Sequence, residues 1–314
     1  MKFRVLAITL ATSCATALSI PSHEAQSNLR TKFKLLAQET RLIDMTEGLD
    51  TFSASVEKSI AAVIYPATVA HQSVVEPLLT NLSTASLRSY LEPFTQFQNR
   101  YYNSTYGAQS SAWLLETVQD LLASSGAINA TAYTFKHNFL KSSVIATIPG
   151  LNARDADRVN NPAPGADDDG SGSVTILEAL RVLLLDEDVK AGKAPNSLEF
   201  HWYSGEEGGL LGSVDVWKQY KAEGKNAKTM LQQDMAGYSK GTTDKGKPEV
   251  VGVITDHVDE GLTTFITEVI DAVNSSPYIH TSQDTIATVN FDHMLQHAKL
   301  TVGLAYESAY ATEL

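Results

Sequence analysis

Three adjacent carboxylates, Asp167, Asp168 and Asp169, stand between glycines in the segment "PGADDDGSGSV", which contains no lysine or arginine. Two carboxylates about 4 Å apart repel each other by about 4 kcal/mol at an effective dielectric constant near 20. Such side chains are stable together when they bind a cation or when some of them serve the backbone instead. We therefore expect one of the three to bind a metal ion, while its neighbours cap the following helix or fix the turn.

Further residues with metal-binding chemistry follow other predicted elements. Glu206 and Glu207 come after the predicted strand "SLEFHWYS", and Asp234 comes after the predicted strand "AKTMLQQ". His280 lies in the loop "PYIHTSQDT", ahead of the last predicted helix. In open α/β sheets, ligands collect beyond the carboxyl ends of the strands. Each motif alone is more typical of a turn, a cap or a structural histidine, but together they predict a site whose oxygen and nitrogen donors suit zinc.

The elements that must position these residues alternate between strands and helices. The predicted strands are "SSVIATI", "SLEFHWYS", "AKTMLQQ" and "PEVVGVIT", and the predicted helices are 74–90, 111–124, "SVTILEALRVLLL", "SVDVWKQYKAEGK", "EGLTTFITEVIDAV" and 291–310. This alternation predicts an α/β fold with a mixed sheet flanked by helices.

The N-terminal region has the pattern of targeting and processing segments. "MKFRVLAITLATSCATALS" combines a basic start, a short apolar run and a small-residue step, which is typical of a cleaved signal peptide, residues 1–17. The apolar run is too short to span a membrane. The weakly patterned residues 18–63 are interpreted as a propeptide, with an N-terminal subdomain as the alternative. Residues 64–314 then form the main domain.

Composition narrows the class of protein. The only cysteine, Cys14, lies in the predicted signal, so a cysteine nucleophile, a disulfide framework and a cysteine-ligated zinc are excluded from the rest of the chain. Glycosylation sequons fit a secreted, extracellular glycoprotein, and they start at Asn81, Asn103, Asn129 and Asn274. The net charge of −12 argues against nucleic acids and anionic membranes as partners.

Four long motifs resemble the M28 family of two-zinc aminopeptidases, and within it the secreted fungal leucine aminopeptidases. They are "PGADDDGSGSVTILEALRVL", "EFHWYSGEEGGLLGS", "LQQDMAGY" and "PYIHTSQDT". The likeness runs from about residue 65 to the end of the chain, and the upstream segment resembles the propeptide of that group. The resemblance implies a zinc-exopeptidase-like fold, peptide or protein N-termini as substrates, a preference for leucine-like first residues, and a monomer.

The resemblance also implies roles for individual residues. Asp168 matches the carboxylate that bridges two zinc ions, and Glu206 matches the general base. Glu207 and His280 match ligands of one zinc, and Asp234 matches a ligand of the other.

Two pieces of the family pattern are missing. Between "SSVIATIPG" and "PGADDDGSG" the family has a strand that ends in a zinc-binding His-x-Asp motif, whereas this chain has "LNARDADRVNNPA". A Ser-Asp-His stretch with a disulfide loop and a further strand is missing before "PYIHTSQDT". Asp155 and Asp157 are the alternative ligands for the first gap, and His137 is interpreted as structural. We therefore expect a sheet lacking one or more strands and one well-ligated zinc, at Asp168, Glu207 and His280.

Two functions stay open on this basis. One is a secreted zinc-dependent aminopeptidase with Glu206 as general base, whose activity the missing histidine impairs. The alternative is a catalytically dead M28-like glycoprotein that binds peptides or a single zinc ion. A serine hydrolase is disfavoured, since no Gly-x-Ser-x-Gly elbow follows a predicted strand.

Overall fold

The computed structural model describes residues 65–66, 68–151, 165–251, 259–267, 278 and 282–312. The predicted signal peptide and propeptide, residues 1–17 and 18–63, lie outside these ranges, as do Asp155, Asp157, Asn274 and His280. In the described part of the chain, none of the helices has the length and apolar character needed to cross a membrane.

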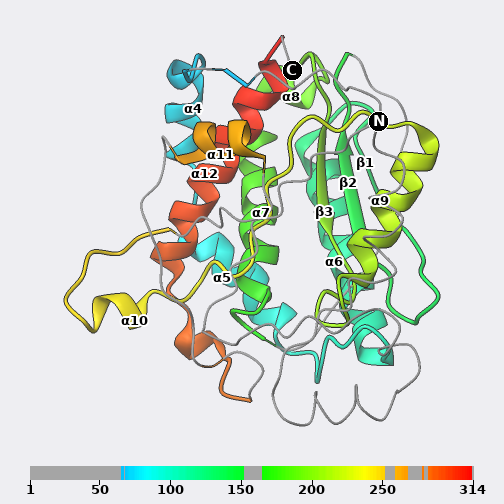
Figure 1. The fold of residues 1–314 in the computed structure, drawn as a ribbon, viewed down its shortest axis with the longest axis vertical. Coiled ribbons are helices and arrows are strands. Elements are labelled where there is room, and N and C mark those ends of the chain that lie inside the picture. The colour runs from blue at the N-terminus through cyan, green and yellow to red at the C-terminus, as the bar shows by residue number, and fades with distance from the viewer. Residues whose placement is uncertain are drawn as a thin grey trace.

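A small antiparallel sheet forms the centre of the described fold (Figure 1). Its strands lie in the order β1 (Thr131–Thr134), β2 (Val144–Ile148) and β3 (Leu198–Trp202). Ala146 at the centre of β2 is paired with Ala132 of β1 and with Phe200 of β3. The register therefore aligns apolar residues of β2 with apolar residues of β3 across the sheet.

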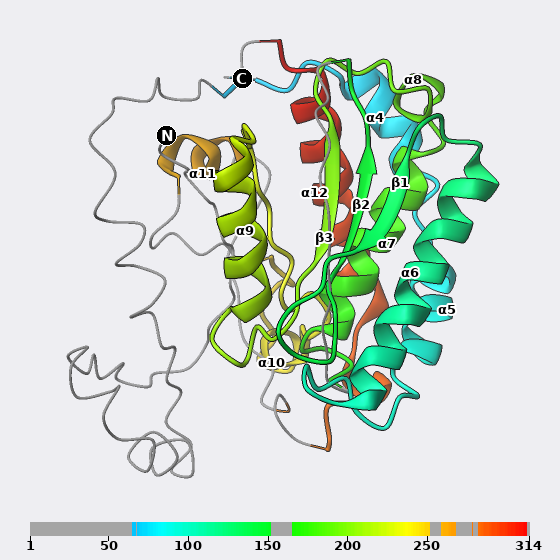
Figure 2. The same cartoon turned by 90° about the vertical axis from the view of Figure 1, so that its right-hand side faces the viewer.

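Helices cover both faces of this sheet (Figure 2). One face bears the main core, built with α4 (Gln72–Leu79), α5 (Thr84–Phe94), α6 (Thr105–Ser125), α7 (Gly170–Leu183) and α12 (Phe291–Tyr310). The opposite face packs against α9 (Leu211–Glu223). The remaining elements are short: α8 (Glu187–Lys190), α10 (Lys240–Thr243), α11 (Glu260–Thr267) and a 3-10 turn, Ile286–Thr288.

Successive residues of β3 point alternately to the main core and to the face covered by α9. Phe200 and Trp202 are buried in the main core, while Glu199 and His201 point to the α9 face, because successive side chains of a strand leave on opposite sides. Ile145 of β2 contributes to the α9 face in the same way. The α/β class that the sequence predicts is therefore confirmed, with helices on both faces of a small sheet.

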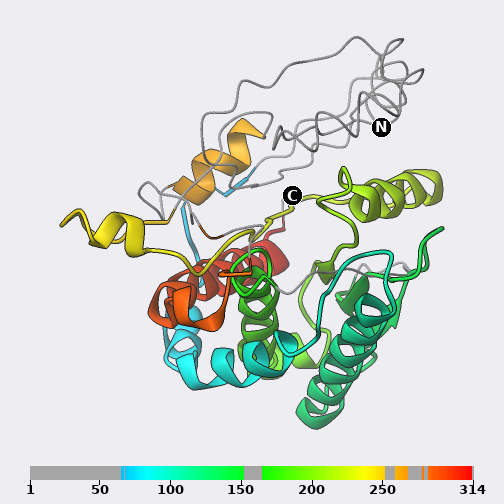
Figure 3. The ribbon, with the colours of Figure 1, turned by 90° about the horizontal axis from the view of Figure 1, so that it is seen from below.

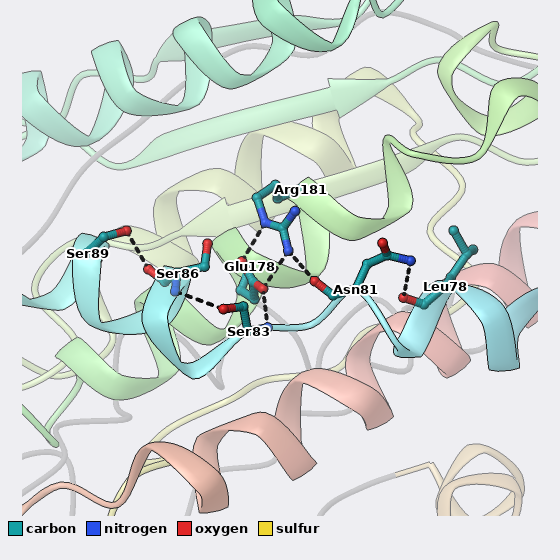
Figure 4. Close-up of polar contacts among 7 residues, drawn as sticks. All are labelled: Leu78, Asn81, Ser83, Ser86, Ser89, Glu178 and Arg181. Carbon is teal, nitrogen blue, oxygen red and sulfur yellow. Dashed lines mark hydrogen bonds and ion pairs between the residues drawn. The ribbon is translucent and has the colours of Figure 1, made fainter.

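The predicted helix over 74–90 is wrong in its extent, because the segment forms α4 and α5 with a turn between them. Ser83 caps α5, since its hydroxyl accepts the N–H of Ser86 at 3.3 Å. The turn is also fixed from α7, where Glu178 accepts the N–H of Ser83 at 2.8 Å and Arg181 donates to the carbonyl of Asn81 at 2.6 Å (Figure 4). Tertiary contacts thus end a helix that periodicity alone would continue.

Two predicted strands do not form in the described part of the chain. "AKTMLQQ" has no strand pairing, and neither does the described part of "PEVVGVIT", residues 248–251. Gln233 packs instead against helices, since its side-chain amide donates to Thr301 of α12. A strand needs a hydrogen-bonded neighbour, and among the described residues the sheet ends at β3. A mixed sheet was expected, whereas the described strands pair only in the antiparallel sense.

The segments that carry the described site residues lie at one end of the molecule. Helices α6, α7, α9 and α12 begin at the lower end in Figure 1, where β3 ends, and Figure 3 views the molecule from that side. Helix N-termini carry a partial positive charge and unpaired N–H groups, so this end favours acidic side chains.

Candidate active site

The three adjacent aspartates have different partners in the structure. Asp169 caps α7, because its carboxylate accepts the N–H of Gly172 at 3.0 Å. Asp167 is fully buried, and its Oδ1 accepts the N–H of Gly237 at 2.8 Å and the hydroxyl of Ser171 at 2.9 Å. The expectation that two members of the run serve the cap and the turn is thus met, and Asp168 stands between them.

Asp167 has an unusual protonation equilibrium. Its Oδ2 is buried without a hydrogen-bond partner among the described residues. Burial, with a smaller contribution from the charge of Asp284, raises the pKa of Asp167 to about 7. A proton on this carboxyl would remove one charge from the acidic run.

A carboxylate from another loop holds the backbone of the run. Asp284 accepts the N–H of Asp167 at 2.9 Å and the N–H of Asp168 at 3.1 Å, and its own carbonyl accepts the N–H of Ala166. The sequence gives no signal for this contact, because the donors are backbone groups.

A buried cation also lies against the run, although no basic residue stands near it in the sequence. Arg100, from the loop before α6, donates to the carbonyl of Gly165 at 2.8 Å and is almost completely buried. Burial lowers the pKa of Arg100 to about 10, and the nearby charges of Asp169, Asp284 and Asp168 oppose that shift. The run is therefore partly neutralised by the protein itself, which the absence of basic residues in the motif did not predict.

Carboxylates from separate segments lie close to Asp234. The pKa of Asp234 lies well above its ordinary value, first through burial and then through repulsion by Asp168, Glu206 and Glu207. Burial and repulsion by Asp234 and Asp168 likewise raise the pKa of Asp169. The structure thus places Asp168, Glu206 and Glu207 near Asp234.

Two glycines allow this convergence. A Cβ atom at Gly172 of α7 would lie 1.9 Å from the carbonyl oxygen of Gln233, so only glycine lets the segment before Asp234 approach the helix. A Cβ at Gly212 of α9 would lie 2.4 Å from the backbone of Ser204, so the chain can turn tightly from β3 through Glu206 and Glu207 into α9. Small residues therefore set the spacing of the acidic side chains.

A divalent cation fits the chemistry of this donor set, since carboxylates that raise one another's pKa are relieved by added positive charge. Within the described residues, however, no group of three or more histidine, cysteine, aspartate or glutamate side chains has a geometry that could hold a metal ion. His280, the predicted nitrogen ligand, lies outside the described residues. His137 bonds to Asp215 at 2.8 Å and stacks on Phe139, in agreement with a structural role.

Comparison with known proteins identifies close relatives. The sequence profile of peptidase family M28 matches residues 154–294. Leucine aminopeptidase 1 of Phaeosphaeria nodorum is 46% identical over 332 residues, which covers 89% of this chain and 85% of the relative. Leucine aminopeptidase 1 of Leptosphaeria maculans is 43% identical, with 89% and 84% covered.

The alignment with the first relative also bears on the predicted gaps. The alignment is 332 residues long, which is more than the 314 residues of this chain, although only 89% of this chain is aligned. The relative therefore contains segments that this chain lacks.

Solved structures share the fold. The LapA aminopeptidase of Legionella pneumophila gives a TM-score of 0.72 at 21% identity, with 93% of this chain and 90% of that chain covered. LapB from the same organism gives 0.69 at 24% identity, with 87% and 82% covered. The arrangement of helices around the sheet is thus that of a known peptidase fold.

Proposed function

Because the chain belongs to peptidase family M28, we propose that it is a secreted, zinc-dependent aminopeptidase that removes leucine-like residues from peptide N-termini. The observation that carries the proposal is the convergence of Asp168, Glu206, Glu207 and Asp234 beyond β3 and at the start of α7. The relatives named leucine aminopeptidase support the activity and the preference for leucine.

One zinc ion would be held by Asp168, Glu207 and His280, and Asp234 would share Asp168 at a second, weaker site. When bound there, zinc lowers the pKa of an attacking water and polarises the scissile carbonyl. The mutual repulsion of the carboxylates supports this assignment, since a metal-free cluster of such charge is unfavourable.

Glu206 is assigned the proton transfers. As a general base it takes the proton of the attacking water, and it then gives a proton to the leaving amine. The acidic cluster also attracts the cationic α-amine of an unblocked peptide, which favours free N-termini. Asp167 and Asp169 are assigned structural roles, since they accept the backbone N–H groups of Gly237 and Gly172.

We propose one well-ligated zinc ion rather than two. Asp168, Glu207 and His280 supply three protein ligands, which suffice for zinc with an open position. The second ion would have Asp168 and Asp234 alone, because the segment with the family's further histidine is missing from "LNARDADRVNNPA".

Secretion and processing of the chain are part of the same proposal. Residues 1–17 act as a signal peptide, 18–63 as a propeptide and 64–314 as the peptidase domain, which works as an extracellular monomer. The acceptor residues Asn81, Asn103 and Asn129 are exposed in the structure, as glycosylation requires. Peptide N-termini are the partners, and nucleic acids and membranes are not.

A catalytically dead glycoprotein that binds peptides or one zinc ion is the second candidate. The missing histidine segment favours it. Both candidates share the fold and differ only in turnover.

Hydrolysis of leucyl-p-nitroanilide by the purified, propeptide-cleaved protein with added zinc tests the proposal. Turnover that a chelator removes and zinc restores supports the aminopeptidase. An absence of chelator-sensitive turnover overturns it in favour of the inactive candidate. A serine-hydrolase inhibitor is the matched negative control and should have no effect.

A further inference from the structure

One carboxylate outside the predicted site contacts the backbone on which the central aspartate stands. Asp284 is buried, with 6% of its surface exposed, and lies just before the 3-10 turn that leads into α12. Its two oxygens accept from consecutive backbone groups, Oδ1 from the N–H of Asp167 and Oδ2 from the N–H of Asp168. A carboxylate in this position fixes the orientation of two successive peptide units.

The opposite side of the same turn is held as well. A Cβ at Gly165 would lie 2.7 Å from Oδ2 of Asp284 and closer still to the carbonyl of Asp168, so the turn closes tightly around the carboxylate. Arg100 donates to the carbonyl of Gly165 at 2.8 Å and supplies the positive charge near Asp284. The turn over 165–168 is therefore fixed by an anion on its N–H groups and a cation on its carbonyl.

The two bonds from Asp284 act as a clamp on the backbone of residues 167 and 168. The charges around Asp168 indicate the role of this clamp. Asp234 lies close enough to Asp168, Glu206 and Glu207 for their charges to raise its pKa, so an unrestrained Asp168 carboxylate would move away from Asp234. The bonds from Asp284 act on the backbone, and they do not occupy the side-chain oxygens of Asp168. The clamp can thus hold Asp168 among like charges while its carboxylate serves another partner.

We propose that Asp284 is a positioning residue for Asp168, which it holds in place for metal binding through the backbone of the acidic run. This inference rests on the proposed function, in which Asp168 is a zinc ligand. Asp284 itself is neither a ligand nor a group that touches substrate. Outer-shell partners of this kind typically change metal affinity by about 10- to 100-fold when they are mutated.

A second carboxylate in the chain provides a matched control. Glu307 of α12 is 4% exposed and also accepts two consecutive backbone N–H groups, from Ala70 and His71, at 3.1 and 2.8 Å. It stands near the C-terminal end of α12, whereas Asp284 precedes that helix. Glu307 also bonds to the ring Nδ1 of His71 at 3.0 Å, so a change there weakens backbone and side-chain bonds away from the acidic cluster.

The experiment measures zinc affinity of the full chain by competition with a chelating dye, together with the melting temperature, for Asp284→Asn and Glu307→Gln. The Asn variant keeps one acceptor and presents an amide donor to the second N–H. We expect Asp284→Asn to weaken zinc binding by about 10-fold or more. Glu307→Gln should lower the melting temperature and leave zinc affinity unchanged.

Two results overturn the positioning role. One is zinc affinity in Asp284→Asn equal to that of the unaltered chain, and the other is an equal loss in Glu307→Gln. If Asp284→Asn does not fold, Asp284→Ser carries the test, because its single hydroxyl cannot accept both N–H groups as the two oxygens do, and unchanged affinity there also overturns the role. Failure of the unaltered chain to bind zinc would instead refute the proposed function from which this role follows.

Discussion

Glu206 and Glu207 are neighbours in the chain, yet the proposed reaction requires opposite behaviour from them. A metal ligand must keep its carboxylate ionised, whereas a general base must accept a proton and release it. The glycine-bounded turn after β3 presents both to the acidic cluster, with Glu206 half-buried and Glu207 exposed. The two roles can therefore be separated by mutation.

Glu206→Gln should lower kcat for leucyl-p-nitroanilide by about 100-fold or more, since proton transfer by a placed side chain contributes about 10²- to 10⁴-fold. Zinc affinity, measured by dye competition, should stay within error of the unaltered chain. Glu207→Gln is the matched comparison, and it should lose zinc affinity as well as turnover. Equal loss of zinc in both variants would contradict the assignment of Glu206 as a base.

Residues of the site differ in how far sequence alone can reveal them. Asp168, Glu206, Glu207 and Asp234 stand in long motifs at the ends of predicted elements, and the structure brings these four together. Asp284 and Arg100 could not be predicted, because their partners are backbone groups of a turn distant in sequence. Hydrogen bonds to backbone groups do not require a particular residue type at the partner position, so the sequence pattern does not reveal them.

At the scale of elements, α7 is joined to the turn between α4 and α5 by Glu178, which accepts the N–H of Ser83, and by Arg181, with which it forms an ion pair inside the helix. Glu178 is fully buried, and Arg181 donates to its two oxygens at 2.7 Å and to the carbonyl of Asn81. Because α7 also starts at the acidic run, this contact fixes the helix on which the site depends.

Arg181→Ala should destabilise the fold by about 3 kcal/mol, since removal of one partner leaves a buried charge unpaired. The free energy of unfolding in urea measures the effect. Lys193→Ala is the control, because its pair with Asp188 is exposed, and no resolvable change is expected there. A loss as small as that of the control would show that Glu178 is satisfied without Arg181.

The α9 face contains a second ion cluster whose effect depends on pH. Glu199 of β3 accepts from Tyr220 of α9 at 2.8 Å, bonds to His201 at 3.0 Å, and lies 3.6 Å from Lys225. Burial by itself would raise the pKa of Glu199, but the bond and charge of His201, with Lys225 and Tyr220, lower it to about 2.

A depressed carboxylate pKa stabilises the fold above the unfolded pKa, near 4.5, and this stabilisation is lost as pH falls towards 2. The shift corresponds to about 3 kcal/mol at neutral pH. Glu199→Gln should therefore be less stable than the unaltered chain at pH 6, and the difference should shrink between pH 4.5 and 3. Urea unfolding at a series of pH values measures this, and a constant difference would contradict it.

The predicted elements differ in how well the structure matches them. Helix α12 has the predicted bounds, Phe291–Tyr310, because its apolar spacing and the Asn290 cap lie within one stretch of sequence. "AKTMLQQ" was predicted as a strand but has no hydrogen-bonded neighbour in the described sheet. Strand β1 was missed, since its four residues are mostly half-exposed and carry little pattern.

At the scale of the whole molecule, metal binding and folding are coupled through the spacing of the ligands. Asp168, Glu207 and Asp234 are far apart in the unfolded chain and meet only after β3, α7 and the 233–237 segment have packed. A ligand that binds the folded state alone stabilises it, by about 2.7 kcal/mol at a concentration 100 times Kd. The acidic net charge of −12 adds a general repulsion that a cation also reduces.

Zinc should therefore raise the melting temperature of the chain by several degrees, as measured by scanning calorimetry with and without the metal. Asp168→Asn should lose this shift, because it removes the carboxylate at the centre of the cluster. Asp215→Asn is the control, since Asp215 bonds to His137, and it should keep the shift. A zinc-induced shift in Asp168→Asn as large as in the unaltered chain would place the metal elsewhere and refute the proposed site.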